Sequence, residues 1–514
     1  MAQIVIFSDV GALGLGRYAG AYRIATELRD SGYEVQVIDF YTNFTAGQMN
    51  RAIQKFVNEN TLWVGFSTTL TSTASDLSDQ SDQKKVQGPS HRLAKNTGKV
   101  AGLGLALGRR DARQILQTIK SVSPRTKIVL GGKSSSQVGE LFKNLVDYVV
   151  EGQGEHSILH ITKKIISDRK LISTDHTPEM TIYTDKEFPV TDYNAPGKYR
   201  IRFHETDLIF PGEALPMEIA RGCIFKCSFC AFDLNGKKLS EFNRDPQTIM
   251  EDLKDAHDRF GTTRWAFADD TYNDSVEKVK ILHKHITALP FKIEWSSYIR
   301  HDVLIRNMDE TATLLYESGL RGACFGIETF NHKAGKAIGK GMPPEETKAG
   351  LARLRKVHGW DEIICVSGFI IGLPFETEED LDNSLEYLID PDCPLDNFSI
   401  AALYIHEDTG FSKNLEKYGY KIKTAANKWV SEWMSSDDAK VILRRWQIKQ
   451  AARFAPNGNG RCSTHTAVPT NFFIRATNLG YTLEEVKNST IEFDEFNERK
   501  MDKIQEYFNK LMDL

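Results

Sequence analysis

The sequence predicts an α/β protein with a doubly wound, Rossmann-like N-terminal domain, a partial six-stranded barrel of the TIM type and a helical C-terminal region. Two observations predict this class. Short runs rich in Val, Ile and Phe alternate with amphipathic stretches over most of the chain, which is typical of parallel strands joined by crossover helices. These runs stop near residue 412, where helical periodicity takes over. We expect domains at 1–166, 213–412 and 413–514, with 167–212 as a connector.

Five strand candidates, and a helix between the first two, define the N-terminal domain. The strands are QIVIFSDV, YEVQVIDF, TLWVGFSTTL, TKIVLGG and VDYVVEGQGE, and the helix is GRYAGAYRIATELRDSG. This alternation predicts a doubly wound sheet. The glycines of GALGLG, with Asp39 as the ribose acid, suggest a dinucleotide site, but their spacing is not the usual G-x-G-x-x-G. The insert from Thr71 to Thr97 is too polar to form core, so we expect a lid or a disordered surface loop.

The central barrel is predicted from six further strand candidates with helical stretches between them. They are LPMEIARGC, RWAFADDTYN, IEWSSYIR, GACFGIETF, IICVSGFIIGLP and NFSIAALYIH. The first crossover helix is well marked, because Asp245 suits the N-cap, Pro246 the first helical position and Gly261 the C-terminal stop. Barrels of this kind place their sites at the carboxyl ends of the strands, so we expect the functional side chains there.

The C-terminal region contains two amphipathic segments, which we interpret as a helical cap on the barrel. The first is DDAKVILRRWQIKQAARFA, and the second is MDKIQEYFNKLMDL. The apolar stripe of the first segment consists of Val441, Leu443, Trp446 and Ala451. Between the two segments lies the loop NGNGRCSTHTAVP, which carries Cys462 and His465.

Composition excludes several classes of protein. The chain has 514 residues and a formal net charge of −4, so bulk charge gives no argument for a nucleic-acid or membrane partner. No apolar run is long enough to span a bilayer, and the opening MAQIVIFSDV reads as a strand rather than as a signal peptide. Seven cysteines in a chain of this length do not make a disulfide framework, so we expect a location in the reducing cytoplasm.

Three of the seven cysteines, Cys223, Cys227 and Cys230, lie close together in RGCIFKCSFCAF. Buried cysteines can cluster by chance, because they behave as small hydrophobic residues. A four-ligand zinc site needs a second paired motif, and the remaining cysteines are scattered singly. Three thiolates can instead hold three irons of a 4Fe–4S cluster and leave the fourth iron open to a substrate or cofactor. The spacing favours the cluster.

The C-x3-C-x2-C spacing, with Phe229 before the last cysteine, resembles the signature of radical S-adenosylmethionine (SAM) enzymes. The resemblance extends from about Leu215 to Gly410. It implies that the cysteines bind a 4Fe–4S cluster whose open iron is chelated by the amino and carboxylate groups of SAM. An electron from the cluster then cleaves SAM to give a 5′-deoxyadenosyl radical. The resemblance also implies an electron donor such as flavodoxin or ferredoxin.

The same resemblance implies which barrel residues bind SAM. Asp269 and Asp270 stand where many members have a Gly-Gly-Glu motif that meets the SAM amino group, and Glu328 matches an acidic position near the ribose. GFIIGLPFET resembles the strand that packs against adenine, where Gly372 would let the backbone approach the ring. The alternative for the three carboxylates is a solvated strand end or a helix cap. The full set implied for SAM is Phe229, Asp269, Asp270, Ser296, Arg300, Glu328, Gly368, Ile370 and Gly372.

The N-terminal domain resembles the cobalamin-binding domain that precedes many radical SAM barrels. The matching landmarks are Ser67 and Thr68 in GFSTTL, Gly131 and Gly132 in LGG, and the segment VVEGQGE. Domains that bind cobalt through histidine carry D-x-H-x-x-G after the first strand, and this chain has SDVGALGLG there. The resemblance therefore implies cobalamin without a histidine ligand, as in some radical SAM methylases, or a domain that has kept the fold and lost the cofactor.

The function expected from these resemblances is radical SAM methylation of an unactivated carbon, with cobalamin as the methyl carrier and a small molecule or peptide as the substrate. One alternative is a cobalamin-independent radical epimerase, cyclase or rearrangement enzyme, in which Cys462 would donate hydrogen to a substrate radical. The other is a SAM-binding or scaffold protein without catalytic function. Methylthio transfer is disfavoured, because relatives that catalyse it use a second, N-terminal cluster and no cysteine precedes Cys223.

Overall fold

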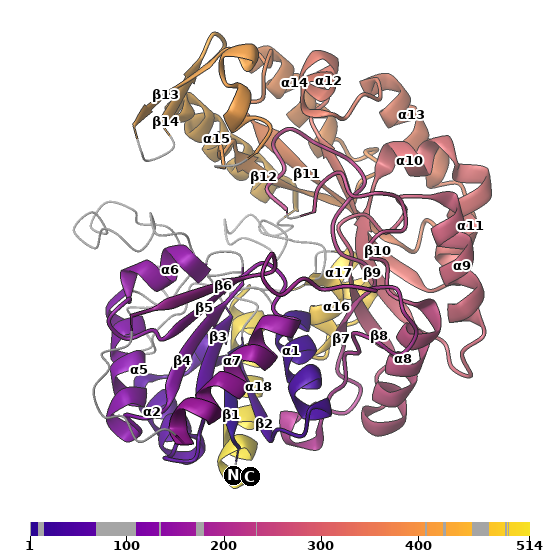
Figure 1. Ribbon diagram of the computed structural model, residues 1–514. Coiled ribbons are helices and arrows are strands. Elements are labelled where there is room, and N and C mark those ends of the chain that lie inside the picture. The colour runs from indigo at the N-terminus through magenta and orange to yellow at the C-terminus, as the bar shows by residue number, and fades with distance from the viewer. Residues whose placement is uncertain are drawn as a thin grey trace. The chain divides into compact units, whose positions relative to one another are not determined.

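The computed structural model describes residues 2–8, 15–67, 109–132, 135–170, 179–232, 234–406, 409–424, 428–454, 472–488, 491 and 493–514. The chain divides into two compact units, which Figure 1 shows coloured along the sequence. The first unit comprises Met1–Pro211 together with Arg499–Leu514, and the second comprises Gly212–Glu498. No helix in the described ranges is long and apolar enough to cross a lipid bilayer.

A six-stranded parallel sheet forms the centre of the first unit. Its strands are β1 (Ile4–Ser8), β2 (Val35–Asp39), β3 (Trp63–Ser67), β4 (Lys127–Gly131), β5 (Tyr148–Glu151) and β6 (Thr181–Thr184). They pair in the order β2-β1-β3-β4-β5-β6. The order reverses between β1 and β3, and doubly wound folds bind ligands at the carboxyl ends of the strands beside such a reversal. The predicted doubly wound domain is therefore confirmed.

Helices cover this sheet within the described part of the first unit. They are α1 (Ala19–Asp30), α2 (Ala46–Phe56), α5 (Arg109–Val122), α6 (Ser135–Leu141), α7 (Glu155–Lys170) and most of α18 (Phe493–Asp513). Helix α1 packs with α7, and α2 packs with α5 (Figure 1). Helix α2 begins with a capping box, in which the Thr45 side chain accepts a hydrogen bond from the Gln48 amide and the Gln48 side chain accepts one from the Thr45 amide.

The segment 167–212 was expected to be a connector, but it lies in the first unit as far as Pro211. It contains β6, which pairs with β5 in parallel and extends the sheet by one strand. The strand has only four residues, TIYT, and none of them is fully buried. A short, half-exposed strand at a sheet edge has no apolar run, so it gives no signal in the sequence.

The C-terminal segment Arg499–Leu514 was expected to cap the barrel, but it belongs to the first unit as the greater part of α18. Its apolar face contains Ile504, Tyr507, Phe508 and Leu511, all buried. The Tyr507 hydroxyl accepts a hydrogen bond from the Asp39 amide at 3.0 Å, at the end of β2. The Phe508 ring packs edge-on against Phe44. The helical periodicity predicts the helix, but it carries no information on which unit the apolar face contacts.

The second unit is built on six parallel strands that pair in the order of the sequence, β7 to β12. They are β7 (Leu215–Glu218), β8 (Arg264–Ala268), β9 (Glu294–Ile299), β10 (Leu320–Glu328), β11 (Ile364–Ile371) and β12 (Asn397–Ala402). Within the described residues β7 and β12 form the two edges of this sheet. The predicted partial barrel is confirmed strand by strand.

Crossover helices follow the strands of the barrel. They are α8 (Pro246–Phe260), α9 (Val276–Thr287), α10 (His301–Arg306), α11 (Met308–Glu317), α12 (His332–Ile338), α13 (Pro344–Leu354) and α14 (Glu378–Ile389). Helix α8 has the predicted ends, because the Asp245 side chain accepts a hydrogen bond from the Thr248 amide at 2.8 Å. Gly261 ends the helix at a φ of 70°, in the left-handed region that favours glycine.

The hairpin β13 (Tyr420–Thr424) and β14 (Lys428–Ser431) and the helices α15 (Ser436–Phe454), α16 (Phe472–Thr477) and α17 (Leu483–Lys487) complete the second unit. The apolar stripe predicted for α15 is partly wrong, because Val441 is 69% exposed. Val441 and Leu443 are two positions apart and so lie on different faces of a helix. The buried face consists of Ala439, Ile442, Trp446 and Gln450.

Candidate cofactor site

The segment that carries the three clustered cysteines follows β7 and folds back on itself. The Cys223 amide donates to the carbonyl of Leu234 at 3.4 Å, and the Gly236 amide donates to the carbonyl of Cys223 at 2.7 Å. Gly222 enters this loop at a φ of 69°, and a Cβ there would lie 2.5 Å from the Cβ of Leu234. Only glycine satisfies both the conformation and the close approach. The backbone therefore fixes Cys223 at the carboxyl end of the first barrel strand.

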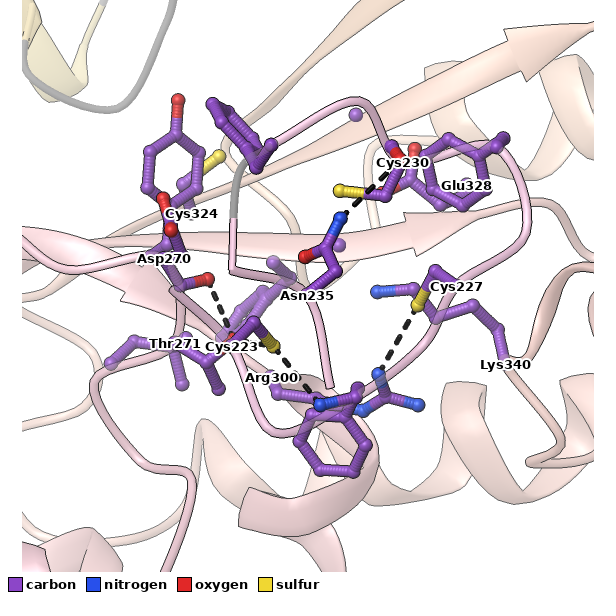
Figure 2. A pocket seen from close by; sticks show the side chains of 18 of the residues that line it. Cys223, Cys227, Cys230, Asn235, Asp270, Thr271, Arg300, Cys324, Glu328 and Lys340 are labelled. Atoms are coloured by element: carbon purple, nitrogen blue, oxygen red, sulfur yellow. Dashed lines mark hydrogen bonds between the residues drawn. The ribbon is translucent and has the colours of Figure 1, made fainter. Parts of the chain in front are cut away.

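All three clustered cysteines line one cavity of about 430 Å³ at the carboxyl ends of the barrel strands (Figure 2). The other predicted residues that line it are Phe229, Asp270, Arg300, Glu328 and Gly368. The predicted residues come from five successive strands or the loops that follow them, and Ser399 of β12 also lines the cavity. This is the place at which barrels of this class carry their sites.

Polar groups contact the sulfur atoms of Cys223 and Cys227 and the backbone of Cys230. The Thr271 hydroxyl oxygen lies 3.0 Å from Cys223 Sγ, and the Phe225 amide donates to the same sulfur at 3.4 Å. The Arg300 guanidinium donates to Cys227 Sγ at 3.5 Å, and the Asn235 amide donates to the Cys230 carbonyl at 3.3 Å. Each cysteine of the motif therefore has a side-chain partner from outside the motif.

Burial and hydrogen bonding act in opposite directions on these thiols. Burial raises the pKa of Cys223, and the hydrogen bonds with Thr271 and the Phe225 amide oppose this rise. Burial also raises the pKa of Cys230, against hydrogen bonds from the Phe232 amide and Asn235. The free thiols of Cys223 and Cys230 thus hold their protons more firmly than exposed cysteines do. A metal that binds them must displace these protons, which makes its affinity dependent on pH.

Arg300, at the end of β9, holds the cysteine loop in place. Its guanidinium donates to both oxygens of Asp302, at 2.7 and 3.2 Å, and to the carbonyl of Gly339 at 2.9 Å. The same group lies 3.6 Å from the centroid of the Phe225 ring, within the cysteine motif. A planar guanidinium suits this position, because it can stack on an aromatic ring and still donate in its own plane.

Glu328 and Lys340 bring opposite charges into the cavity. Glu328 ends β10 at a φ of 69°, in the left-handed region that non-glycine residues adopt uncommonly. Burial raises the pKa of its carboxyl group, while the charges of Lys340 and Arg300 oppose the rise. A Cβ on Gly326 would lie 2.7 Å from Lys340 Nζ and 3.1 Å from Glu328 Oε1. The glycine therefore makes room for both polar groups.

The two adjacent aspartates after β8 have different environments. Asp270 lines the cavity, as predicted. Asp269 does not line it, because its carboxylate is buried against Lys278 at 2.7 Å and accepts a hydrogen bond from the Thr271 amide at 3.0 Å. Lys278 also lies 3.4 Å from Asp274. Asp269 was predicted to contact SAM, but in the structure its carboxylate forms a buried ion pair with Lys278.

Three other predicted residues, Ser296, Ile370 and Gly372, do not line the cavity either. Ser296 is fully buried in β9. Gly372 was expected to approach adenine, but a Cβ there would lie 2.5 Å from Cη2 of Trp429. Its φ is 98°. The left-handed backbone and the indole that packs against this residue each account for a glycine at this position.

The carboxyl edge of the N-terminal sheet carries the described part of the second predicted site. Ser67 and Gly131 are paired Cα partners at the ends of β3 and β4. A Cβ on Gly131 would meet no atom of the described residues within 4 Å, and Gly132 has a φ of 104°. The carboxyl ends of the strands are where doubly wound folds bind ligands. Thr68 lies outside the described residues.

The carboxylate of Asp39, the acid of the suggested dinucleotide site, binds other side chains of the protein. It forms a buried ion pair with Arg17 at 2.7 Å and accepts a hydrogen bond from the Tyr22 hydroxyl at 2.5 Å. Arg17 also donates to the carbonyl of Asp207 at 2.8 Å. These contacts remove the carboxylate from ribose binding, so the dinucleotide interpretation is wrong for this residue.

The structure adds residues that the sequence patterns did not single out. The cavity is also lined by Phe225, Asn235, Thr271, Cys324 and Lys340. No group of three or more His, Cys, Asp or Glu residues within the described ranges converges to hold a single metal ion. Three thiols spaced around a cavity suit a polynuclear cluster, in which each ligand binds a different metal atom. Cys462 and His465 lie outside the described residues.

Comparison with known proteins identifies the barrel and the fold. Residues 217–388 match the Radical SAM superfamily. An uncharacterised methyltransferase of Pyrococcus horikoshii is 23% identical over 315 residues, which cover 57% of this chain and 64% of that protein. The anaerobic magnesium-protoporphyrin IX monomethyl ester cyclase of Cereibacter sphaeroides is 23% identical over 314 residues, 56% of this chain and 48% of that protein. The matched part thus spans less than two thirds of either relative.

Two solved structures resemble the chain over most of its length. The radical SAM methyltransferase TsrM from Kitasatospora setae, with cobalamin and a 4Fe–4S cluster bound, superposes with a TM-score of 0.63 at 16% identity. This match covers 97% of this chain and 99% of TsrM. OxsB, a cobalamin-dependent SAM radical enzyme, superposes with a TM-score of 0.58 at 14% identity, over 86% of this chain and 66% of OxsB. The chain therefore carries a radical SAM domain in residues 217–388 and has the fold of cobalamin-dependent radical SAM enzymes.

Proposed function

We propose that this chain is a cobalamin-dependent radical SAM methyltransferase, in which Cys223, Cys227 and Cys230 bind a 4Fe–4S cluster. The observation that carries the proposal is the convergence of the three thiols on one cavity at the carboxyl ends of the barrel strands. The fold of TsrM and the similarity to the methyltransferase of Pyrococcus horikoshii support the reaction class. A cluster bound here, together with SAM, supplies the electron and the methyl donor.

The donor set of the cavity fits such a cluster. Thiolates are soft ligands that suit iron–sulfur clusters, and three of them leave one iron open for another ligand. The hydrogen bonds to Cys223 and the positive charge of Arg300 favour the thiolate form of this cysteine. These contacts offset part of the rise in pKa that burial causes.

The charged groups of the cavity fit the amino acid part of SAM. Its ammonium group requires carboxylate acceptors, and Asp270 and Glu328 supply them. Its carboxylate group requires a cation, and Lys340 is available in the same cavity. Lys340 has no carboxylate within ion-pairing distance among the residues that the structure describes. In this assignment Asp270 keeps the role predicted from the sequence, Glu328 contacts the ammonium group rather than the ribose predicted for it, and Lys340 is added to them.

The N-terminal unit supplies the cobalamin site in this proposal. Ser67, Gly131 and Gly132 lie at the carboxyl edge of its sheet, and among the described residues a Cβ on Gly131 would meet no atom within 4 Å. We infer a small molecule as the methyl acceptor, since TsrM is described with tryptophan as its substrate. A flavodoxin or ferredoxin is the proposed electron donor. Purification under anaerobic conditions with cobalamin supplied, followed by an absorbance spectrum, tests whether the unit holds the cofactor.

Iron and sulfide analysis of the anaerobically reconstituted protein tests the cluster directly. The wild-type chain should bind about four irons and four sulfides. Alanine at Cys223, Cys227 or Cys230 should remove the cluster and SAM cleavage. Cys393→Ala is the matched control, because Cys393 is half-buried and lies outside the cavity. A 4Fe–4S cluster retained in all three variants would contradict the ligand assignment.

The same preparation separates the alternative functions. A scaffold protein would bind no iron. A cobalamin-independent epimerase would form 5′-deoxyadenosine without cobalamin, and its product would take up deuterium from the solvent. In that case Cys462→Ala should still form 5′-deoxyadenosine but lose the solvent deuterium from the product. Methyl transfer that requires cobalamin would support the proposal and leave Cys462 without a catalytic task.

A further inference from the structure

The hydroxyl group of Thr271 has two acceptors and one proton. Its oxygen lies 3.0 Å from Cys223 Sγ and 2.6 Å from the carbonyl oxygen of Asp270. When Cys223 is a neutral thiol, the S–H group donates to the hydroxyl oxygen and the hydroxyl donates to the Asp270 carbonyl. Both hydrogen bonds are then satisfied with one proton each.

A metal-bound thiolate changes this arrangement, because its sulfur has no proton to donate. If the Thr271 hydroxyl kept its bond to Asp270, its lone pairs would face a negatively charged sulfur at 3.0 Å. Rotation of the hydroxyl proton toward Cys223 Sγ removes this repulsion and forms a charge-assisted hydrogen bond.

We propose that Thr271 donates its hydroxyl proton to Cys223 Sγ when that sulfur binds the cluster, and that this bond raises the reduction potential of the cluster. The inference rests on the cluster assignment of the proposed function. Addition of an electron increases the negative charge on the sulfur ligands, so a hydrogen bond stabilises the reduced cluster more than the oxidised one. Hydrogen bonds to the sulfurs are among the features that set the potential of such clusters.

A buried ion pair keeps Thr271 beside the sulfur. The Thr271 amide donates to Asp269 Oδ1 at 3.0 Å, and its carbonyl accepts a hydrogen bond from Lys278 Nζ at 3.3 Å. Asp269 and Lys278 are joined at 2.7 Å, with side chains 1% and 6% exposed. The backbone of Thr271 is thus held on both sides, and only the hydroxyl is free to turn. This gives Asp269 a positioning role in place of the SAM contact predicted for it.

The partners of the other two cysteines differ from Thr271. Cys227 faces Arg300, whose guanidinium carries its charge in both redox states and donates at 3.5 Å. At Cys230 the Asn235 amide donates to the backbone carbonyl at 3.3 Å. Among these partners, Thr271 is the hydroxyl whose single proton can change acceptor. Removal of the Thr271 hydroxyl group leaves the charge of the cavity unchanged.

The test is the midpoint potential of the reconstituted cluster, measured by a redox titration monitored by electron paramagnetic resonance without substrate. Thr271→Val removes the hydroxyl and keeps the branched shape. We expect a tenfold shift of the redox equilibrium toward the oxidised cluster, which is about 59 mV for one electron. Thr271→Ser should keep the wild-type potential. The matched control is Thr262→Val, since the buried Thr262 also donates to a carbonyl, that of Glu213, but precedes β8 at its opposite end.

The outcomes separate the inference from the function on which it rests. If the wild-type chain assembles no cluster, the proposed function is contradicted. A full cluster with the wild-type potential in Thr271→Val would overturn the inference alone. Thr271→Ala provides the same loss of the hydroxyl if the valine variant fails to assemble. Loss of the cluster in both variants would assign Thr271 to assembly rather than to the potential, and would also overturn the inference.

Discussion

Substitution of Gly372 by Ala distinguishes a role in packing from a role beside adenine. The residue has a φ of 98°, and its Cβ would lie 2.5 Å from Trp429 Cη2. The indole cannot move away easily, because it is 1% exposed and its Nε1–H donates to the Leu403 carbonyl at 2.9 Å. The left-handed backbone costs about 1–2 kcal/mol for an L-residue. The added methyl group costs about 1–3 kcal/mol more in a packed core.

We therefore expect Gly372→Ala to lower the free energy of unfolding of the second unit by about 2–5 kcal/mol, the sum of these two costs. Urea unfolding of the metal-free protein, followed by tryptophan fluorescence, measures it. Gly341→Ala is the control, since a Cβ at Gly341 meets no atom within 4 Å. SAM affinity of the folded, cluster-loaded variant should be unchanged. Weaker SAM binding at an unchanged unfolding midpoint would refute the packing explanation and restore the contact with adenine.

Three further predictions follow from the contacts described above. Glu328→Gln should weaken SAM binding about 10- to 150-fold, which is the range for loss of a hydrogen bond to a charged group. Calorimetry on the cluster-loaded protein measures this affinity. An unchanged affinity would show that the carboxylate has a structural role. Burial raises the pKa of Glu376 from 4.5 to about 8, so the folded state keeps a proton that the unfolded chain releases, and stability should fall as pH rises between these values. Glu376→Gln should flatten this slope in urea titrations at pH 5 to 8, and equal slopes would contradict the assignment. Tyr507→Phe removes the hydroxyl that accepts a hydrogen bond from the Asp39 amide, so it should destabilise the first unit by about 1–3 kcal/mol. The measurement is the rate of hydrogen exchange in β2, which should increase. Equal exchange rates in the two proteins would show that this hydrogen bond does not stabilise the unit.

The strands could be predicted because parallel strands are buried on both faces and therefore form continuous apolar runs. The ends of α8 could be predicted because Asp245 and Gly261 act within one turn of the helix. The cysteine motif is also local, since its three thiols reach the same cavity from one loop. In each case the residues that determine the structure lie close together in the sequence.

The rest of the site depends on residues that meet only in the folded chain. Thr271 and Lys340 have no motif of their own. Thr271 reaches the cavity from the segment after β8, and Lys340 reaches it from the loop after α12. Asp269 and Asp270 are adjacent, and successive side chains along an extended segment point in opposite directions. Which of the two faces the cavity is decided by Lys278, whose buried ammonium group attracts Asp269. No spacing rule in the sequence indicates that contact.

The pairing of α18 with the first unit has a consequence for the order of events during synthesis on the ribosome. Arg499 follows Pro211 by 288 residues, and both belong to the same unit. At a translation rate of about 5–20 residues per second, the N-terminal sheet waits roughly 15–60 s for its last helix. During that time the surface that receives Tyr507 and Phe508 is exposed, and the whole barrel emerges before it is covered. The part of the chain made first is therefore completed last, and we expect chaperones that hold exposed apolar surfaces to bind the nascent N-terminal sheet.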